Sequence, residues 1–381
     1  MGKPNIVVTM GLQFGSEGKG QISGMIAEQW RPEVVVCANH PNAGHTYREP
    51  NSIKFIHRIL PVGAIASGVK YVLIGPGAVV DPVALVAEVN ELGRYGLWRN
   101  RHLIIHPNAA IVTPQDVDRE QEFVKIGSTM KGSAEAVIRK MRRGLYGINT
   151  IRDAFRDLAD KDYDAMRLLP VKPVIDAGCY DEAIDAASKI LVEGAQGFSL
   201  GIHERFYPYG TSRDVSVHQV LADCRIPVGC PMYVMGVARS YPIRVANRFD
   251  ASGQQIGTSG PCYWDQTEID WKELKLEPEL TTVTKLPRRI FTFSQTQIRE
   301  AVRVTGANGV ALTFCDYHPS VVTLIDQIGL IQQSAPVVSL SFGPEYGDVY
   351  DADKEALRNP NFSTITLQDV DYKKVIDGYF K

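Results

Sequence analysis

The sequence predicts an α/β fold in which a large, mostly parallel central sheet is flanked by helices. Short segments rich in Val and Ile, bounded by Gly or Pro, recur along the whole chain, which is typical of strands buried on both faces. Stretches with helical spacing alternate with these segments, as in a wound α/β fold. With 381 residues, of which 44% are hydrophobic and 22% charged, the chain can bury the large core that such a sheet needs.

The individual elements follow from these patterns in chain order. Continuous apolar runs predict strands at residues 5–10, 34–38, 71–74, 103–106, 190–193, 233–238, 310–314 and 337–341. Helical spacing predicts helices at 18–29, 82–93, 132–143, 180–188 and 295–305. Strand and helix therefore alternate from the N-terminus to residue 341.

Two regions interrupt the alternation. The first, at about 110–180, is helix-like and contains a basic run, Arg139, Lys140, Arg142 and Arg143. The second, at about 240–290, is rich in aromatic residues, Gly, Thr and Pro. Long excursions of this kind usually carry a site or an interface, although a basic run is also typical of a solvated helix face. We expect a single domain over residues 1–381 with one helical and one loop-rich excursion.

Charge and cysteine content exclude several classes of function. The chain has 41 Lys and Arg against 43 Asp and Glu, a net charge of -2, so a nucleic acid polymer is not an expected partner. The six cysteines form no CxxC pair and are expected to be free thiols in a reducing compartment. No apolar run approaches the roughly 18 residues of a membrane span, and the N-terminus does not have the pattern of a signal peptide. These features predict a cytoplasmic protein with no membrane partner.

The first motif that points to chemistry is GLQFGSEGKG at residues 11–20, between an expected strand and an expected helix. Glycines let backbone N–H groups approach an anion, the helix N-terminus adds its dipole, and Lys19 supplies a charge. These features predict a phosphate site. It is not a Walker A loop, because Gln13 stands in place of the first Gly and Gly20 in place of the hydroxyl residue. The alternative is a tight glycine turn with an exposed lysine.

A second motif, NAGHT at residues 42–46, follows the second expected strand. His45 can donate a proton or contact a phosphate, and the carbonyl group of Gly44 can face a metal ion. A histidine in a loop is by itself more often a surface or core residue. The motif therefore indicates function only together with the glycine-rich segment.

Together the two segments resemble the GxQWGDEGKG and NAGHT motifs of the adenylosuccinate synthetase family. Further similar motifs are IGPGAV from Ile74, KMRRG from Lys140, EGAQG from Glu193, YPYGTS from Tyr207, TTVTKLPRR from Thr281, and FGP at 342–344. Because they run from residue 11 to residue 344, the resemblance covers nearly the whole chain. It implies the P-loop-related fold of that family and a ligase reaction, in which a nucleoside triphosphate drives the joining of L-aspartate to a purine nucleotide.

The resemblance also implies the site residues. The catalytic residues would be Ser16, Lys19, His45 and Gln196. The donor nucleotide would contact Ser16, Gly18, Lys19, Gly20, Gly44, His45, Thr46, Phe314, Asp316, Gly343 and Pro344. The purine monophosphate would contact Ser16, Asn42, Ser128, Thr129, Arg142, Gln196 and Thr211, and aspartate would contact Thr282, Val283, Thr284 and Arg288. Magnesium would be held at Ser16 and Gly44.

In the reaction of the family, the γ-phosphoryl group passes to O6 of the purine, and the amine of aspartate then displaces phosphate at C6. The resemblance assigns the transferring phosphoryl group to Lys19, the developing phosphate to His45 and a hydrogen bond at O6 to Gln196. It also implies a homodimer, because Arg142 reaches the monophosphate from the other subunit. The preceding loop is one residue shorter than usual, so Arg143 is the alternative.

Ser16 is the sharpest departure from the family. An Asp there takes the proton from N1 of the inosine base and ligates magnesium, whereas serine is a weaker base and a poorer ligand. Loss of a general base from an unchanged reaction costs about 10²–10⁴-fold in rate. A hydroxyl group also leaves room beside the N1–C2 edge, where guanine carries an amino group. This pattern resembles the phage-type branch, which converts dGMP and L-aspartate to the N6-succinyl derivative of 2-aminodeoxyadenylate, on the way to diaminopurine DNA.

Two further departures agree with that branch. Leu286 stands where the family has an arginine associated with the ribose, which suits a deoxyribose, and a shift of one residue would put Lys285 there instead. Phe314 replaces the lysine that helps to select GTP, so we expect ATP or dATP as the donor, with the ring stacked on a purine or, alternatively, buried in the core. Two other functions stay open: an adenylosuccinate synthetase that uses IMP and GTP, and a catalytically silent nucleotide-binding protein.

Overall fold

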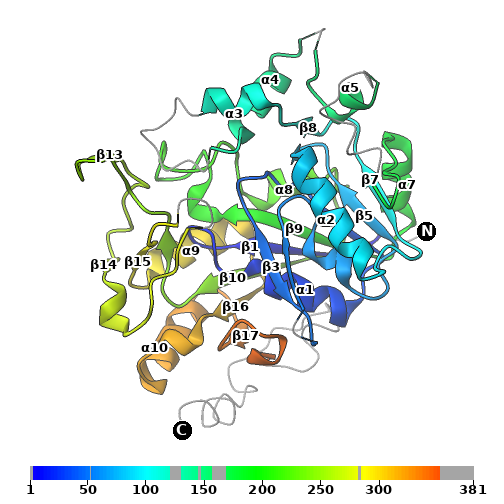
Figure 1. The fold of residues 1–381 in the computed structure, drawn as a ribbon. Coiled ribbons are helices and arrows are strands. Elements are labelled where there is room, and N and C mark those ends of the chain that lie inside the picture. Colours follow the sequence, from blue (N-terminus) through cyan, green and yellow to red (C-terminus); the bar gives the residue numbers. More distant parts are fainter. Residues whose placement is uncertain are drawn as a thin grey trace.

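The computed structural model describes residues 3–51, 53–120, 130–144, 147–156, 169–281 and 285–351. It confirms the expected α/β fold (Figure 1). Nine strands form the central sheet in the order β18-β17-β16-β10-β1-β9-β2-β5-β7. All neighbours pair in parallel except β18, which runs antiparallel to β17 at one edge.

Every expected strand is present in this sheet. The strands are β1 (Asn5–Gly11), β2 (Val34–Cys37), β5 (Tyr71–Ile74), β7 (His102–Ile105), β9 (Lys189–Gly197), β10 (Met232–Arg239), β16 (Gly309–Thr313), β17 (Val337–Ser341) and β18 (Val349–Asp351). All residues of β2, β16 and β17 are buried. Burial on both faces explains why these strands are continuous apolar runs rather than alternating patterns.

The helices include the five expected ones with ends shifted by a few residues. They are α1 (Lys19–Trp30), α2 (Pro82–Arg94), α3 (Pro114–Glu120), α4 (Ser133–Met141), α5 (Ile151–Arg156), α7 (Ala177–Ala186), α8 (Val217–Asp223), α9 (Gln295–Thr305) and α10 (Val321–Gln332). Short 3₁₀ helices lie at Val62–Ile65, Phe198–Leu200, Trp271–Leu274, Cys315–Tyr317 and Tyr346–Asp348. Helix α10 was not among the expected helices, because its apolar, β-branched composition hides the helical period.

The connections between strands decide where a ligand can bind. The β1–α1–β2 unit runs toward the β7 edge of the sheet, whereas the β10–α9–β16 unit runs toward the β18 edge. Because such crossovers are right-handed, α1 and α9 cover opposite faces of the sheet (Figure 1). Open α/β sheets bind ligands outside the carboxyl ends of the strands where the direction changes. Here that place is beside β1 and β10.

Smaller sheets are attached to the central sheet. The antiparallel pair β3 (His45–Arg48) and β4 (Lys54–His57) follows β2, and the parallel pair β6 (Val79–Val80) and β8 (Ala110–Ile111) follows β5 and β7. The loop-rich region contains β11 (Ile243–Arg244), β12 (Arg248–Phe249), β13 (Gln255–Gly257), β14 (Glu268–Ile269) and β15 (Arg289–Phe291). In Figure 1, α3, α4 and α5 gather at one end of the molecule, well away from α10.

The basic run at the end of α4 divides into two pairs. The Arg139 guanidinium donates to the Asp116 carboxylate, with Nη2 2.8 Å from Oδ2, and the Lys140 ammonium donates to the Pro76 carbonyl at 2.6 Å. Burial lowers the pKa of Lys140. Arg142 and Arg143 are exposed. The alternative of a solvated helix face is therefore wrong for Arg139 and Lys140, which bind α4 to its neighbours. It fits only Arg142 and Arg143.

All six cysteines lie in the described part of the chain and are free thiols. Within that part, none of the helices combines the length and the apolar character needed to cross a membrane.

Candidate functional site

A cavity of about 1070 Å³ lies at the carboxyl ends of the central strands, where the topology predicts a ligand site. It is lined by the expected residues Ser16, Gly18, Lys19, Gly20, Asn42, Gly44, His45, Thr46, Gln196, Thr211, Arg288 and Phe314. Arg142, Asp316, Gly343 and Pro344 are described but do not line it. Ser128, Thr129, Thr282, Val283 and Thr284 lie outside the described residues. The cavity thus gathers segments that are up to about three hundred residues apart in the sequence.

The glycine-rich segment forms a loop that turns directly into α1. Gly15 and Gly18 have φ angles of 86° and 80°, a region that suits glycine. Ser16 has φ 59°, and its side chain is exposed to the cavity. Because Gly18 offers no side chain to cap α1, the first N–H groups of the helix are left for a ligand. The loop and the helix dipole therefore form an anion site.

Glu17, which was not among the expected site residues, organises this loop. Its buried carboxylate accepts hydrogen bonds from the backbone N–H groups of Gln13 at 3.1 Å and Gly15 at 2.7 Å. Its second oxygen lies 2.8 Å from Nζ of Lys19, which is itself buried. The alternative of an exposed lysine in a plain turn is therefore wrong. The signal in the sequence was an acidic residue two positions before Lys19 in a glycine-rich loop, since a glutamate is almost never fully buried unless it is paired.

Gly20 brings the backbone of α1 onto β3. A Cβ atom added at Gly20 would lie 2.5 Å from the carbonyl oxygen of Thr46 and 2.7 Å from its nitrogen. Only glycine permits this contact between main chains. His45 and Thr46 were expected in a loop, but they begin β3, which pairs with β4. The strand therefore sets His45 beside the anion site.

His45 has a defined acidic partner. Its Nδ1 lies 3.3 Å from Oε2 of Glu193, whose carboxylate also accepts the backbone N–H groups of Val62 at 3.0 Å and Gly63 at 3.1 Å. Both side chains of the pair are buried. His57 is the cross-strand neighbour of His45, and burial lowers the pKa of His57 to about 4, so it is neutral at physiological pH. A neutral His57 does not compete with His45 for the charge of Glu193. Glu193 therefore orients His45 through Nδ1, which leaves Nε2 for a ligand.

Gln196 and Thr211 form another wall of the cavity. Nε2 of Gln196 donates to Oδ1 of Asn42 at 3.2 Å, and this bond joins the end of β9 to the loop after β2. The Thr211 hydroxyl oxygen is buried and has no hydrogen-bond partner among the described residues. A buried hydroxyl without a partner is costly, so Thr211 is set to contact a ligand.

Phe314 lies on the cavity wall rather than in the core. It follows β16 with φ 57°, and the guanidinium carbon of Arg239 lies 3.9 Å from its ring centroid. Arg239 is fully buried, pairs with Glu279 and donates to the Ser16 carbonyl at 3.1 Å. Burial would raise the pKa of Glu279, but the positive charge of Arg239 and its hydrogen bonds hold that pKa below its usual value. Arg239 therefore fixes both the Phe314 ring and the backbone at Ser16.

The loop-rich excursion contributes Arg288. Its backbone N–H donates to the Glu279 carbonyl at 2.8 Å, and its carbonyl accepts the indole N–H of Trp271 at 2.7 Å. Burial, together with the positive charge of Arg239, lowers the pKa of Arg288. Lys285 and Leu286 both line the cavity, so the two alternatives for the missing family arginine face the same space.

The oxygen atoms of the site fit a magnesium ion that a nucleotide shares. Ser16 and Gly44 both line the cavity, and a serine hydroxyl and a backbone carbonyl are oxygen groups that can ligate magnesium. No cluster of three or more His, Cys, Asp or Glu side chains suited to a metal occurs among the described residues. Magnesium in nucleotide enzymes keeps several waters and binds mainly through phosphate oxygens, so few protein ligands suffice.

Known proteins resemble the chain over most of its length. The family model described as adenylosuccinate synthetase matches residues 7–167 and 171–329. The chain is 43% identical to an N6-succino-2-amino-2'-deoxyadenylate synthase of Salmonella phage PMBT28, over 87% of this chain and 90% of that protein. It is 39% identical to the enzyme of the same name from Acinetobacter phage SH-Ab 15497, over 89% and 90%.

Among solved structures, the chain resembles the succinoaminodeoxyadenylate synthetase of cyanophage S-2L, bound to dGMP and to dATP as an energy donor. The TM-score is 0.83 and the identity 37%, over 93% of this chain and 97% of that one.

Proposed function

The chain belongs to the adenylosuccinate synthetase family, and from that premise we propose that it joins L-aspartate to dGMP. ATP or dATP would drive the reaction, and the product would be N6-succinyl-2-amino-2'-deoxyadenylate, a precursor of diaminopurine DNA. The observation that carries this proposal is Ser16 on the cavity wall, at the position of the family aspartate. Relatives that are 38–43% identical bear the name of this activity, and the similar cyanophage structure holds dGMP and dATP.

In the first step, O6 of the purine attacks the γ-phosphoryl group of the donor, the bond to the β-phosphate oxygen breaks, the nucleoside diphosphate leaves, and the N1 proton of the purine passes to water. Lys19 and the first N–H groups of α1 hold the transferring group and neutralise its charge. Lys19 exchanges its contact with Glu17 for the phosphoryl oxygens. Ser16 and Gly44 would hold a magnesium ion, which would supply positive charge to the transferring phosphoryl group.

In the second step, the amine of aspartate attacks C6, the bond from C6 to the phosphorylated oxygen breaks, phosphate leaves, and the proton released by the amine passes to water. His45 would donate a hydrogen bond from Nε2 to the departing phosphate in its doubly protonated form, with Nδ1–H on Glu193, while Gln196 would contact the O6 side. Arg288, together with Thr282, Val283 and Thr284, would bind the aspartate carboxylates, because arginine binds a carboxylate through two parallel hydrogen bonds. Thr211 and Asn42, with Ser128 and Thr129, would bind the monophosphate.

Changing Glu193 to Gln should lower kcat at least about 10-fold with little change in KM for dGMP, because the carboxylate orients His45 rather than touching substrate. Steady-state kinetics with dGMP would measure this. The matched control is Glu88→Gln. Glu88 is also buried, but the hydrogen bonds that it accepts come from the backbone N–H groups of Arg58, Ile59 and Leu60 and not from His45. If both variants lose stability and neither loses turnover, Glu193 is only structural.

The donor base would lie against Phe314, whose ring is supported from behind by Arg239. An aromatic ring stacks on any purine and offers no hydrogen bond to the guanine edge, which favours ATP or dATP over GTP. Asp316, Gly343 and Pro344, near the ends of β16 and β17, would border the same base. We also propose a homodimer, in which the exposed Arg142 reaches the monophosphate of the partner subunit. The reaction would take place in the host cytoplasm, where the free thiols stay reduced.

Product formation tests the function directly. The enzyme is incubated with magnesium, L-aspartate and ATP, and dGMP, GMP and IMP are compared in parallel by mass spectrometry. We expect a succinyl adduct from dGMP and little from IMP. An adduct from IMP alone would overturn the proposal and leave an adenylosuccinate synthetase. Binding of dGMP without turnover of any substrate would instead indicate a silent nucleotide-binding protein.

A further inference from the structure

Arg244 is a buried arginine of the cavity wall with no assigned role. It ends β11, and only 3% of its surface is exposed. Its guanidinium carbon lies 4.4 Å from the ring centroid of Phe14 and 5.5 Å from that of Phe206. Two aromatic faces thus hold the cation in a fixed place.

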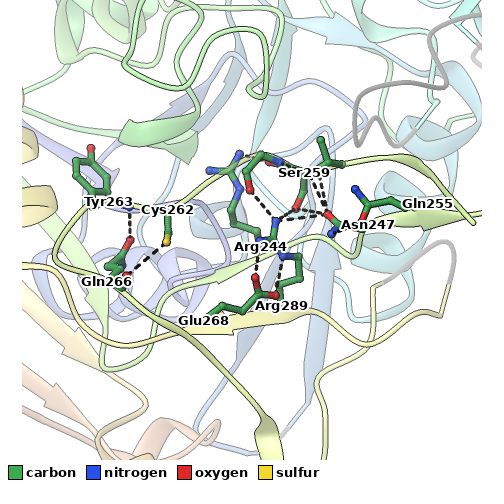
Figure 2. A network of polar contacts seen from close by, with 11 residues as sticks. Arg244, Asn247, Gln255, Ser259, Cys262, Tyr263, Gln266, Glu268 and Arg289 are labelled. Carbon is green, nitrogen blue, oxygen red and sulfur yellow. Dashed lines mark hydrogen bonds and ion pairs between the residues drawn. The ribbon is translucent and has the colours of Figure 1, made fainter.

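The hydrogen bonds of Arg244 leave much of the guanidinium unused. Nη2 donates to the carbonyl of Tyr209 at 2.6 Å. It also donates to the carbonyl of Ser259 (Figure 2). Nε and Nη1 are buried and have no partner among the described residues. The residues described also include no carboxylate that pairs with Arg244.

Arg289 shows the contrast on the same turn. It donates to the Gly260 carbonyl at 2.6 Å and to the Ser259 hydroxyl at 3.0 Å, and it pairs with the Glu268 carboxylate at 2.6 Å (Figure 2). Arg289 does not line the cavity. Of two neighbouring arginines, the one outside the cavity has an acidic partner in the protein and the one on the cavity wall has none.

Keeping Arg244 charged in the protein without ligand therefore costs free energy. Burial, and secondly the charge of Arg289, lower the pKa of Arg244 to about 9. A buried cation with unpaired donors costs free energy unless an anion joins it. The cavity is where such an anion can enter.

Thr211 places a second unused group nearby. It follows Tyr209 by two residues, lines the same cavity, and has a buried hydroxyl without a partner among the described residues. An arginine and a hydroxyl that both lack partners are suited to the oxygens of a phosphate or a carboxylate.

We propose that Arg244 is a substrate-binding residue, whose guanidinium binds an oxyanion of the substrates, a phosphate monoester or a carboxylate, at the Thr211 side of the cavity. The proposal rests on the proposed function for the identity of the substrates. The guanidinium reaches the anion by turning away from the carbonyls of Tyr209 and Ser259, since its free N–H groups are covered in the absence of ligand.

The test compares Arg244→Met with Arg289→Gln. Steady-state kinetics give KM for dGMP and for aspartate, and thermal unfolding is followed without ligand and with each substrate alone. Arg244→Met should raise one of the two KM values about 10- to 100-fold, the range for charge-assisted hydrogen bonds. A rise for dGMP identifies the phosphate as the anion, and a rise for aspartate identifies a carboxylate. The stabilisation of unfolding by that same substrate should be lost.

Arg289→Gln removes hydrogen bonds to the same turn without touching the cavity, so its KM values should stay within about twofold of the native enzyme. Without ligand, Arg244→Met should lose no more Tm than Arg289→Gln, because it also removes an uncompensated charge. Unchanged KM values in Arg244→Met, or equal changes in both variants, would overturn the inference. Binding of dGMP and aspartate is measured even if the native enzyme fails to turn over dGMP, so failure of the proposed function is seen separately.

Discussion

Changing Lys19 to Met should lower kcat about 10²–10³-fold, the effect of removing one group that stabilises charge in the transition state. Lys19 is buried at the start of α1 on the cavity wall, where the helix dipole and the loop N–H groups converge. No other described side chain of the glycine-rich segment carries a positive charge. Release of the nucleoside diphosphate during single turnover would measure the loss.

Loss of Lys19 also leaves Glu17 as a buried carboxylate without its partner, which destabilises the fold. The double variant Lys19→Met, Glu17→Gln separates the two effects. It should recover stability, because the amide oxygen can still accept the N–H groups of Gln13 and Gly15, but it should not recover turnover. Turnover within about 10-fold of the native enzyme in either variant would show that Lys19 does not hold the transferring group.

Changing Ser16 to Asp should lower kcat/KM for dGMP at least about 100-fold, because the carboxylate crowds the 2-amino group and buries a charge beside it. The backbone gives no reason for misfolding, since φ at Ser16 is 59° and Asp tolerates that region better than most residues. Thermal unfolding should confirm an unchanged Tm. On a purine without the 2-amino group, such as IMP, the same variant should be no worse than the native enzyme.

Ser16→Asn is the matched control, because asparagine has the size of aspartate without its charge. If kcat/KM for dGMP falls in both variants, the size of the side chain at position 16 selects the base. If it falls in Ser16→Asp alone, the charge of the side chain selects the base. If Ser16→Asp used dGMP as well as the native enzyme, Ser16 would not select the base. If it improved turnover of IMP while the native enzyme ignored dGMP, the chain would be an ordinary adenylosuccinate synthetase.

The sequence predicted the central sheet well because its signals are local. Runs such as the four residues of β2 are buried on both faces, so apolar composition and the flanking Gly or Pro suffice to find them. The helix α10 was missed for the opposite reason. Val321, Ile325 and Ile328 have the composition of a strand, and only the tertiary structure gives them a helical period.

The site divides in the same way. Lys19, His45 and Gln196 belong to short motifs, so the sequence pointed to them, and the cavity brings them together. Glu17 and Arg244 were missed, because their importance lies in what surrounds them. A carboxylate facing loop N–H groups, or a guanidinium between two rings, depends on contacts between distant segments that no local pattern contains.

Because the backbones of Gly20 and Thr46 touch directly, the main chain sets the distance between Lys19 and His45. Lys19 and His45 are each one residue away from a place where helix and strand backbones touch without side chains between them. A changed side chain elsewhere in the core therefore alters the distance between the two groups only if it moves one of these two backbones. Core substitutions that leave these two backbones in place would change the thermal stability of the protein but not the distance between Lys19 and His45.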